Sequence, residues 1–180
     1  LLVFFCSFHA NSEENLRQLK IDSLRQKIEV SKQDTNRMYL YLQLGEQYRN
    51  IKNDTAMLYY KKAYELGKNL QHLDGMMQSV NFMGIIQLNS GNYDAALNHF
   101  LESLELAEKN NNKYVQSISY QNMGLVHGAL ENEYRSRNYF KKALLKVAFI
   151  NGKCSEDSSK MSDYCFIFAF GAKYIRKGIF

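Results

Sequence analysis

Histidine is the side chain in this sequence best suited to acid–base or metal chemistry, and the four histidines lie far apart, at positions 9, 72, 99 and 127. His127 has no Cys, Asp or Glu at metal-ligand spacing on its own expected helix. His127 falls at a position that faces the core of the repeat described below. We therefore interpret His127 as a packed, hydrogen-bonded residue rather than a ligand or general base.

Cysteine offers no better candidate for chemistry. The three cysteines, Cys6, Cys154 and Cys165, form no CxxC pair, and their odd number argues against a disulfide framework. In an oxidising compartment Cys154 could pair with Cys165. The sequence also contains no Gly-rich phosphate loop, no HExxH helix and no GxSxG turn. We predict no catalytic activity, no cofactor and no metal site.

The composition indicates a folded, helical chain. Of 180 residues, 46% are hydrophobic and 23% are charged, which is typical of a globular core rather than of disorder. The sequence has no proline, so nothing interrupts long helices. The composition therefore predicts an all-α fold.

Basic residues and tyrosines raise the question of nucleic acid. From Arg135 onward there are 10 basic and 3 acidic residues, against 13 and 15 before it. We favour a solvated helix face for this basic third, with nucleic-acid binding as an alternative. Several of the 13 tyrosines fall at repeat positions facing other helices, and we predict that they are core. They are Tyr41, Tyr48, Tyr60, Tyr93 and Tyr120.

The strongest signal is a pattern that recurs at an interval of forty residues. When residues 80–106 are laid over residues 120–146, the pair Met83-Gly84 falls on Met123-Gly124. Leu44-Gly45 takes the same place one unit earlier, with the following turn shortened by one residue. Each unit has the pattern of two amphipathic helices separated by a short polar turn.

Each unit carries a glycine in the middle of its first helix, where glycine costs about 1 kcal/mol relative to alanine. We predict that the missing side chain lets the two helices approach, with a small residue opposite. A large aromatic residue then fills the groove formed with the next helix. The signature positions are Gly45, Ala56, Tyr60, Ala63, Gly84, Gly91, Tyr93, Ala96, Phe100, Gly124, Phe140 and Ala143.

This signature resembles the tetratricopeptide repeat (TPR), most clearly in Val80-x-x-Met83-Gly84 followed by Gly91-Asn-Tyr93-Asp-x-Ala96-x-x-x-Phe100. The unit is forty residues long rather than ~34, which matches the long-repeat variety of the family. No proline closes a unit, and Gln87 and His127 stand where an aromatic residue is usual. The resemblance implies a right-handed superhelix of antiparallel helix pairs, an α-solenoid. The segments Asp22-Ser-Leu24 and Asp34-Thr-x-Arg37 also resemble the start of the TPR sensor regions of Bacteroidota-type histidine kinases and helix-turn-helix regulators.

The repeat divides the chain into six parts. Residues 1–10 are apolar and resemble the end of a truncated signal peptide, with an apolar first turn packed on the fold as the alternative. Residues 11–33 suit an N-terminal capping helix, and three units follow at 34–72, 73–112 and 113–150. Residues 151–180 are a degenerate fourth unit or the end of a fragment. We expect an exported, periplasmic or membrane-associated protein, with a cytoplasmic one as the alternative.

The resemblance implies a non-catalytic scaffold that binds a protein or peptide on a concave face lined by the first helix of each unit. One alternative is the extracytoplasmic sensor region of a membrane-tethered signal-transduction regulator. Another is nucleic-acid binding, which we consider the weaker of the two. The residues carried over to the concave face by position are Tyr39, Leu42, Glu46, Arg49, Gln78, Asn81, Ile85, Leu88, Ile118, Gln121 and Leu125.

Overall fold

A computed structural model describes the backbone of residues 2–151 and the side chains of residues 14–147. The described residues form helices and no strand, which confirms the all-α prediction. The prediction of a degenerate fourth unit at 151–180 and the pairing of Cys154 with Cys165 lie outside this part of the chain. The backbone of residues 2–10 belongs to the first helix. The signal-peptide hypothesis stays a prediction.

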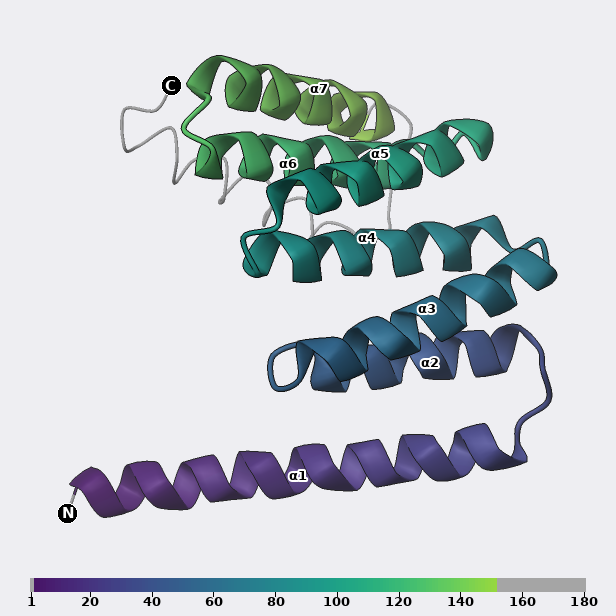
Figure 1. The fold of residues 1–180 in the computed structure, drawn as a ribbon, viewed down its shortest axis with the longest axis vertical. Coiled ribbons are helices and arrows are strands. Elements are labelled where there is room, and N and C mark those ends of the chain that lie inside the picture. The colour runs from purple at the N-terminus through teal and green to yellow at the C-terminus, as the bar shows by residue number, and fades with distance from the viewer. Residues whose placement is uncertain (1, 152–180) are drawn as a thin grey trace. The chain divides into compact units, whose positions relative to one another are not determined.

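The helices follow one another as antiparallel hairpins joined by short turns (Figure 1). They are α1 (Leu2–Val30), α2 (Thr35–Tyr48), α3 (Asn53–Asn69), α4 (Leu73–Asn89), α5 (Tyr93–Lys109), α6 (Lys113–Ala129) and α7 (Glu133–Asn151). The pairs α2–α3, α4–α5 and α6–α7 start where the three sequence units start. The chain divides into two compact units, Leu1–Ser79 and Val80–Phe180, so the boundary falls inside α4. From here on, the first unit and the second unit are these two parts of the chain and not the sequence repeats.

Four of the helices end in the same way, on a residue with left-handed backbone. At the end of α3 the φ angle of Gln71 is 54°, and the amide of His72 donates to the carbonyl of Gly67 at 2.8 Å. This 6→1 hydrogen bond is the mark of a Schellman motif, which satisfies the last carbonyls of a helix. Gly91, Asn111 and Glu131 occupy the same position after α4, α5 and α6. The turn after α2 is built differently, since the amides of Ile51 and Lys52 both donate to the carbonyl of Tyr48, at 2.9 and 2.8 Å.

The recurring glycines lie directly against the aromatic ring of the second helix of the same pair. A Cβ atom built at Gly84 would lie 2.5 Å from Cε1 of Phe100, and one at Gly45 would lie 2.5 Å from Cε1 of Tyr60. Close helix approach is thus the reason for glycine, as predicted. The ring of Phe100 lies against Gly84 and also clusters with Met123 and Val126 of the next helix, α6, as predicted for the groove.

Each unit has its own core around these rings. Tyr60, Ala56 and Ala63 are fully buried in the first unit, together with Met38 and Leu44. The second unit has a cluster at the α5–α6 interface. Its buried members are Ala96, Phe100, Leu104, Met123 and Val126.

At the α6–α7 interface the small residue opposite the glycine is Ser136. Its hydroxyl donates to the carbonyl of Gly124 at 2.8 Å. Phe140 and Ala143 are buried on the same side of α7. Of the remaining signature positions, Tyr93 is half-buried and Gly91 is exposed in its turn.

Candidate functional site

In the first unit the residues predicted to line a concave face differ in how much surface they offer. Tyr39 is 36% exposed and lies edge-on to the ring of His72, with the ring centroids 5.8 Å apart. Gln78 is also exposed. Leu42 is only 5% exposed, so little of its surface is available to a partner.

The two charged residues predicted for this face, Glu46 and Arg49, are bound to each other. Arg49 Nη2 lies 2.7 Å from Oε1 of Glu46, and the hydroxyl of Tyr60 donates to Oε2 of the same carboxylate at 3.2 Å. Burial, with Glu46 nearby, raises the pKa of Tyr60 above its ordinary value, so Tyr60 stays a neutral donor. The carboxylate of Glu46 therefore already has two partners within its own unit, Arg49 and Tyr60.

In the second unit an amide pair joins α4 to α6. Nδ2 of Asn122 donates to Oδ1 of Asn81 at 2.8 Å. Ile85 lies one turn after Asn81 on α4, and Ile118 and Leu125 lie one turn to either side of Asn122 on α6, so these side chains share the same stripes. All three are half-buried. We define the α4–α6 face as the residues Asn81, Ile85, Ile118, Gln121, Asn122 and Leu125.

Two predicted lining residues of this unit contribute less surface than expected. Gln121 is only 8% exposed. Leu88 is half-buried and, like Ile85, packs against the core cluster between α5 and α6. The placement of these residues gives no direct test of binding, and the concave-face assignment stays a prediction.

Asn122, which donates to Asn81, is not among the residues predicted from the sequence. Asn122 belongs to a group of buried polar residues on α6 that the TPR pattern does not contain. Gln116 Nε2 donates to the carbonyl of Ala107 at 3.1 Å, and Ser119 Oγ donates to Oγ of Ser103 at 3.2 Å. Amide and hydroxyl side chains at apolar repeat positions were the signal that could have identified this group.

His127 is packed in the core between α6 and α7, as predicted, but its predicted hydrogen bonding does not include Nδ1. The side chain is 6% exposed and stacks on Tyr139, with ring centroids 5.3 Å apart and an interplanar angle of 3°. Nδ1 is buried and makes no hydrogen bond to a described residue. Burial, with Arg135 nearby, lowers the pKa of His127 below its ordinary value of 6.5.

Two similar aromatic stacks lie at equivalent positions of the first and third helix pairs. In α2–α3, Tyr59 stacks on Tyr41 and Tyr48, and the ammonium group of Lys62 lies 5.4 Å from the ring centroid of Tyr59. In α6–α7 the same roles fall to Tyr139, Tyr120, His127 and Lys142. The rings and lysines thus occupy one another's faces, which leaves less aromatic surface for stacking on bases.

The described residues form neither a metal site nor a membrane-spanning helix. In the part of the chain that the structure describes, no three His, Cys, Asp or Glu side chains gather closely enough to hold a metal ion. His72 is used differently, since its Nδ1 accepts the amide of Gly75 at the start of α4, at 3.1 Å. None of the described helices is both long enough and apolar enough to cross a bilayer.

Solved structures with the same fold come from proteins of low sequence identity. Aspartyl phosphate phosphatase F from Bacillus subtilis is 19% identical, with a TM-score of 0.69 over 80% of this chain and 39% of its own length. A Rap protein complexed with competence and sporulation factor is 19% identical, with a TM-score of 0.66 over 79% of this chain and 42% of its own. BtubC from P. vanneervenii matches 93% of this chain and 67% of its own, at 19% identity and a TM-score of 0.66.

These likenesses establish a TPR-like helical repeat fold, which is typical of protein-binding scaffolds. The chain spans less than half the length of the phosphatase and of the Rap protein. The absence of catalysis stays a prediction, because one of these proteins is described as a phosphatase. No curated protein sequence matches the chain.

One family match extends over most of the chain. Residues 9–154 match the family described as the SusR N-terminal TPR domain. The match begins within α1 and includes all three helix pairs. The chain therefore belongs to the family of the SusR N-terminal TPR domain.

Proposed function

We propose that this chain is a scaffold that binds a peptide or a protein segment on the α4–α6 face. The observation that carries the proposal is the hydrogen bond between Asn122 and Asn81. That bond uses one donor and one acceptor of the pair. Asn81 is half-buried and keeps Nδ2 as a donor for a ligand, whereas Asn122 is only 8% exposed and serves to fix the amide of Asn81. An amide donor held in a fixed position matches the carbonyl oxygen of a peptide backbone.

The surroundings of the amide pair suit the same ligand. Ile85, Ile118 and Leu125 are half-buried, so they expose part of an apolar surface next to the two amides. An apolar surface with a few fixed polar groups is the usual composition of a peptide-binding face. In support, a Rap protein with the same fold is described in complex with competence and sporulation factor.

The proposal can be tested by selecting binders from a random peptide library and measuring their affinity for variants by fluorescence anisotropy. Asn81→Asp keeps the acceptor for Asn122 but removes the donor offered to the ligand. We expect this substitution to weaken binding by about tenfold, as for a lost hydrogen bond with an added acceptor–acceptor repulsion. Asn98→Asp makes the same change on the exposed side of α5 and should leave affinity unchanged. Equal affinity of both variants, or failure to enrich any peptide, would reject the proposal.

A second candidate is that the binding unit is the sensory part of a longer signal-transduction regulator. The family description, which places this kind of TPR domain at the N-terminus of SusR, favours it. Occupancy of the binding face would then be transmitted to an output domain, and an exported location would suit such a sensor. The reading frame downstream of residue 180 tests this candidate. A transmembrane helix followed by a kinase or DNA-binding domain would support it, and an immediate stop codon would oppose it.

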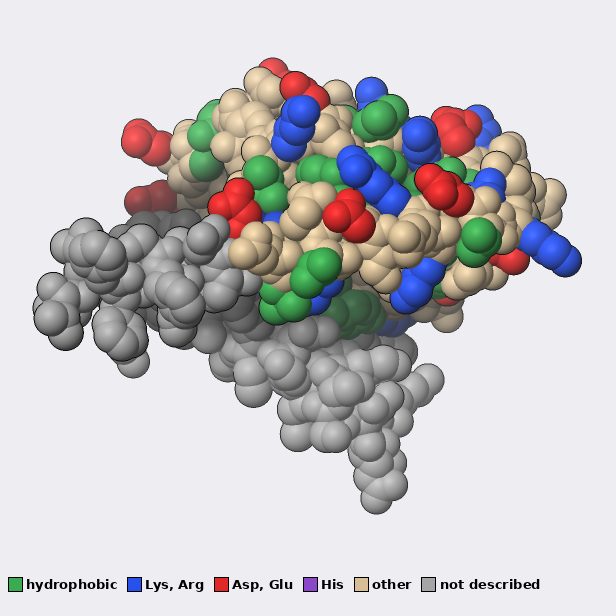
Figure 2. All heavy atoms as spheres, turned by 90° about the horizontal axis from the view of Figure 1, so that it is seen from below, with side chains coloured by type: hydrophobic (Ala, Val, Ile, Leu, Met, Phe, Trp, Pro, Cys, Tyr) green, Lys and Arg blue, Asp and Glu red, His purple; other side chains and the backbone are tan. Residues whose placement is uncertain are grey.

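The third hypothesis is nucleic-acid binding through the basic residues from Arg135 onward, of which the described ones lie on α7. Figure 2 draws one face of the molecule, on which basic and acidic side chains are interspersed. Phosphate binding depends on clustered cations, and retention on a polyanion at low ionic strength tests the basic residues of α7.

A further inference from the structure

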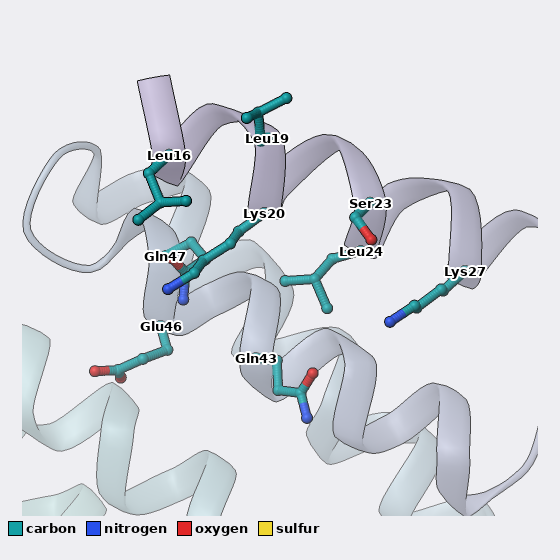
Figure 3. Close-up of a pocket in the computed structure, with 9 residues that line it drawn as sticks. All are labelled: Leu16, Leu19, Lys20, Ser23, Leu24, Lys27, Gln43, Glu46 and Gln47. Atoms are coloured by element: carbon teal, nitrogen blue, oxygen red, sulfur yellow. The ribbon is translucent and has the colours of Figure 1, made fainter. Parts of the chain in front are cut away.

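The first unit contains a groove of about 460 Å³ between α1 and α2, which the proposed function does not use. On the α1 side it is lined by Ser23, by two lysines, Lys20 and Lys27, and by three leucines, Leu16, Leu19 and Leu24. On the other side α2 supplies two glutamines and Glu46. Figure 3 shows Lys20 and Leu24 pointing from α1 toward α2. The groove therefore combines an apolar wall with two ammonium groups.

Only part of the apolar surface of α1 is used to pack it against the unit. Ile21 is 3% exposed, and Leu24 and Ile28 are half-buried on the same stripe. Leu16 and Leu19, on the neighbouring stripe, are 55% and 67% exposed. Two exposed leucines one turn apart, beside a groove, form the kind of anchor surface that a second helix covers.

Polar contacts at the C-terminal end of α1 set the groove before any partner arrives. Arg37 on α2 donates from Nη2 to the carbonyl of Ile28 and from Nε to Oγ of Ser31, each at 2.9 Å. Arg25 donates from Nη2 to the hydroxyl of Tyr48 at 2.8 Å. A preformed groove avoids much of the ordering cost that binding otherwise carries.

The charges of the groove favour an acidic partner. Glu46 is its only acidic residue, and its carboxylate is held by Arg49 at 2.7 Å. In the described part of the chain, neither Lys20 nor Lys27 has a carboxylate within ion-pair distance. The two lysines lie seven residues apart on α1, about 10 Å along its axis. Carboxylates two turns apart on a neighbouring helix would match this spacing.

We propose that the α1–α2 groove binds an acidic amphipathic helix of a partner protein, with apolar side chains against Leu16 and Leu19 and carboxylates at Lys20 and Lys27. This surface is separate from the α4–α6 face, and the proposal does not depend on binding there. The complementary charges would steer the encounter and exclude basic helices, while the leucines would supply the apolar contact.

The probe is a synthetic amphipathic peptide of about 18 residues, long enough for helix formation, with leucines on one stripe and glutamates seven residues apart beside it. A second peptide has lysine in place of each glutamate. Binding is measured by fluorescence anisotropy against the full chain and two double variants. Lys20→Glu with Lys27→Glu reverses the charge of the groove, and Lys61→Glu with Lys68→Glu makes the same change at the same spacing on exposed positions of α3.

We expect the acidic peptide to bind the unaltered chain and to bind the groove variant at least about tenfold more weakly. The lysine peptide should show the opposite preference, and the α3 control should behave as the unaltered chain. Leu19→Gln should also weaken binding, while thermal unfolding shows that all variants stay folded.

The proposal is overturned if the acidic peptide does not bind, or if both double variants bind it equally. A chain that sediments as a dimer and does not bind the peptide would assign the groove to a second copy and would likewise overturn it. Asn81→Asp should not affect the acidic peptide. If library-selected peptides respond to Asn81→Asp while the acidic peptide fails to bind, this inference is wrong and the function proposed for the α4–α6 face stands.

Discussion

Replacing Gly84 with alanine would place a methyl group where the ring of Phe100 now lies. The built Cβ atom is 2.5 Å from Cε1 of Phe100, and this ring is fully buried. Carbon atoms in contact prefer a separation of about 3.5 to 4.0 Å, so the ring has to move by about 1 Å in a packed core. Overpacking of this kind costs about 1–3 kcal/mol, and a rigid buried ring is near the upper end.

The gain from helix propensity works in the opposite direction. Alanine in mid-helix is about 1 kcal/mol more favourable than glycine. The net loss in the free energy of unfolding for Gly84→Ala is therefore about 2 kcal/mol. At Gly124 the built Cβ lies 3.1 Å from Cε1 of Phe140, so the ring needs to move by about half as much. Strain and propensity then nearly cancel, and Gly124→Ala should change stability by less than about 0.5 kcal/mol.

The measurement is urea unfolding followed by circular dichroism, with the midpoint and the m value compared between variants. Both glycines lie in the second unit, so they report on the same folding unit. Shortening the ring in the double variant Gly84→Ala with Phe100→Leu should cost less than the sum of the single changes, because leucine does not reach the added methyl group. Equal effects at Gly84 and Gly124, or strictly additive effects in the double variant, would refute the argument from ring contact.

Three further outcomes follow from local features. Gly91→Ala should lower the free energy of unfolding by about 1 kcal/mol. The cause is the left-handed backbone, with φ at 76°, and not a clash, because no neighbouring atom is within 4 Å. Glu131→Gly, at φ 56°, should raise the free energy of unfolding by up to about 1 kcal/mol, and thermal unfolding measures both changes. Because the pKa of His127 is lowered in the folded state, the unfolded chain binds more protons than the folded chain below about pH 6.5. The contribution of His127 to the free energy of unfolding should therefore be constant above that pH and fall below it. Urea unfolding at several pH values should show a smaller acid loss for His127→Phe than for the unaltered chain, and an equal loss would contradict the assignment. Arg37→Met should release the end of α1, and limited proteolysis should then cleave near Ser31 faster without a change in the second unit.

The positions of the helix pairs could be predicted from sequence because glycine at a fixed interval is a strong and local signal. The closeness of each ring to its glycine could not. Helical spacing gives the stripe on which Gly84 and Phe100 lie, but the rotation of one helix against the other decides how near the ring comes to the glycine. The same limit applied to α1, where two neighbouring stripes are apolar. Helical spacing does not distinguish Ile21, which is buried, from Leu16 and Leu19, which are largely exposed.

The candidate site was harder to predict because its central residue breaks the repeat pattern. Gln121 aligns with Asn81 at the forty-residue interval, so the sequence analysis placed both on the binding face. In the structure the contact is made by the next residue, Asn122, and Gln121 is buried. Adjacent residues of a helix point about 100° apart, and two amides in succession cannot be distinguished by periodicity alone.

The polar residues of α6 give the second unit a fixed register that an apolar core would lack. Sliding α6 by one turn against its neighbours would separate Asn122 from Asn81 and Ser119 from Ser103. Each buried polar group left unpaired costs about 1–3 kcal/mol, whereas leucine or valine in the same places would tolerate the shift. The α4–α6 face would then hold its amide pair at one spacing before a ligand arrives. A peptide that matches this spacing gains affinity, because neither helix has to move when it binds.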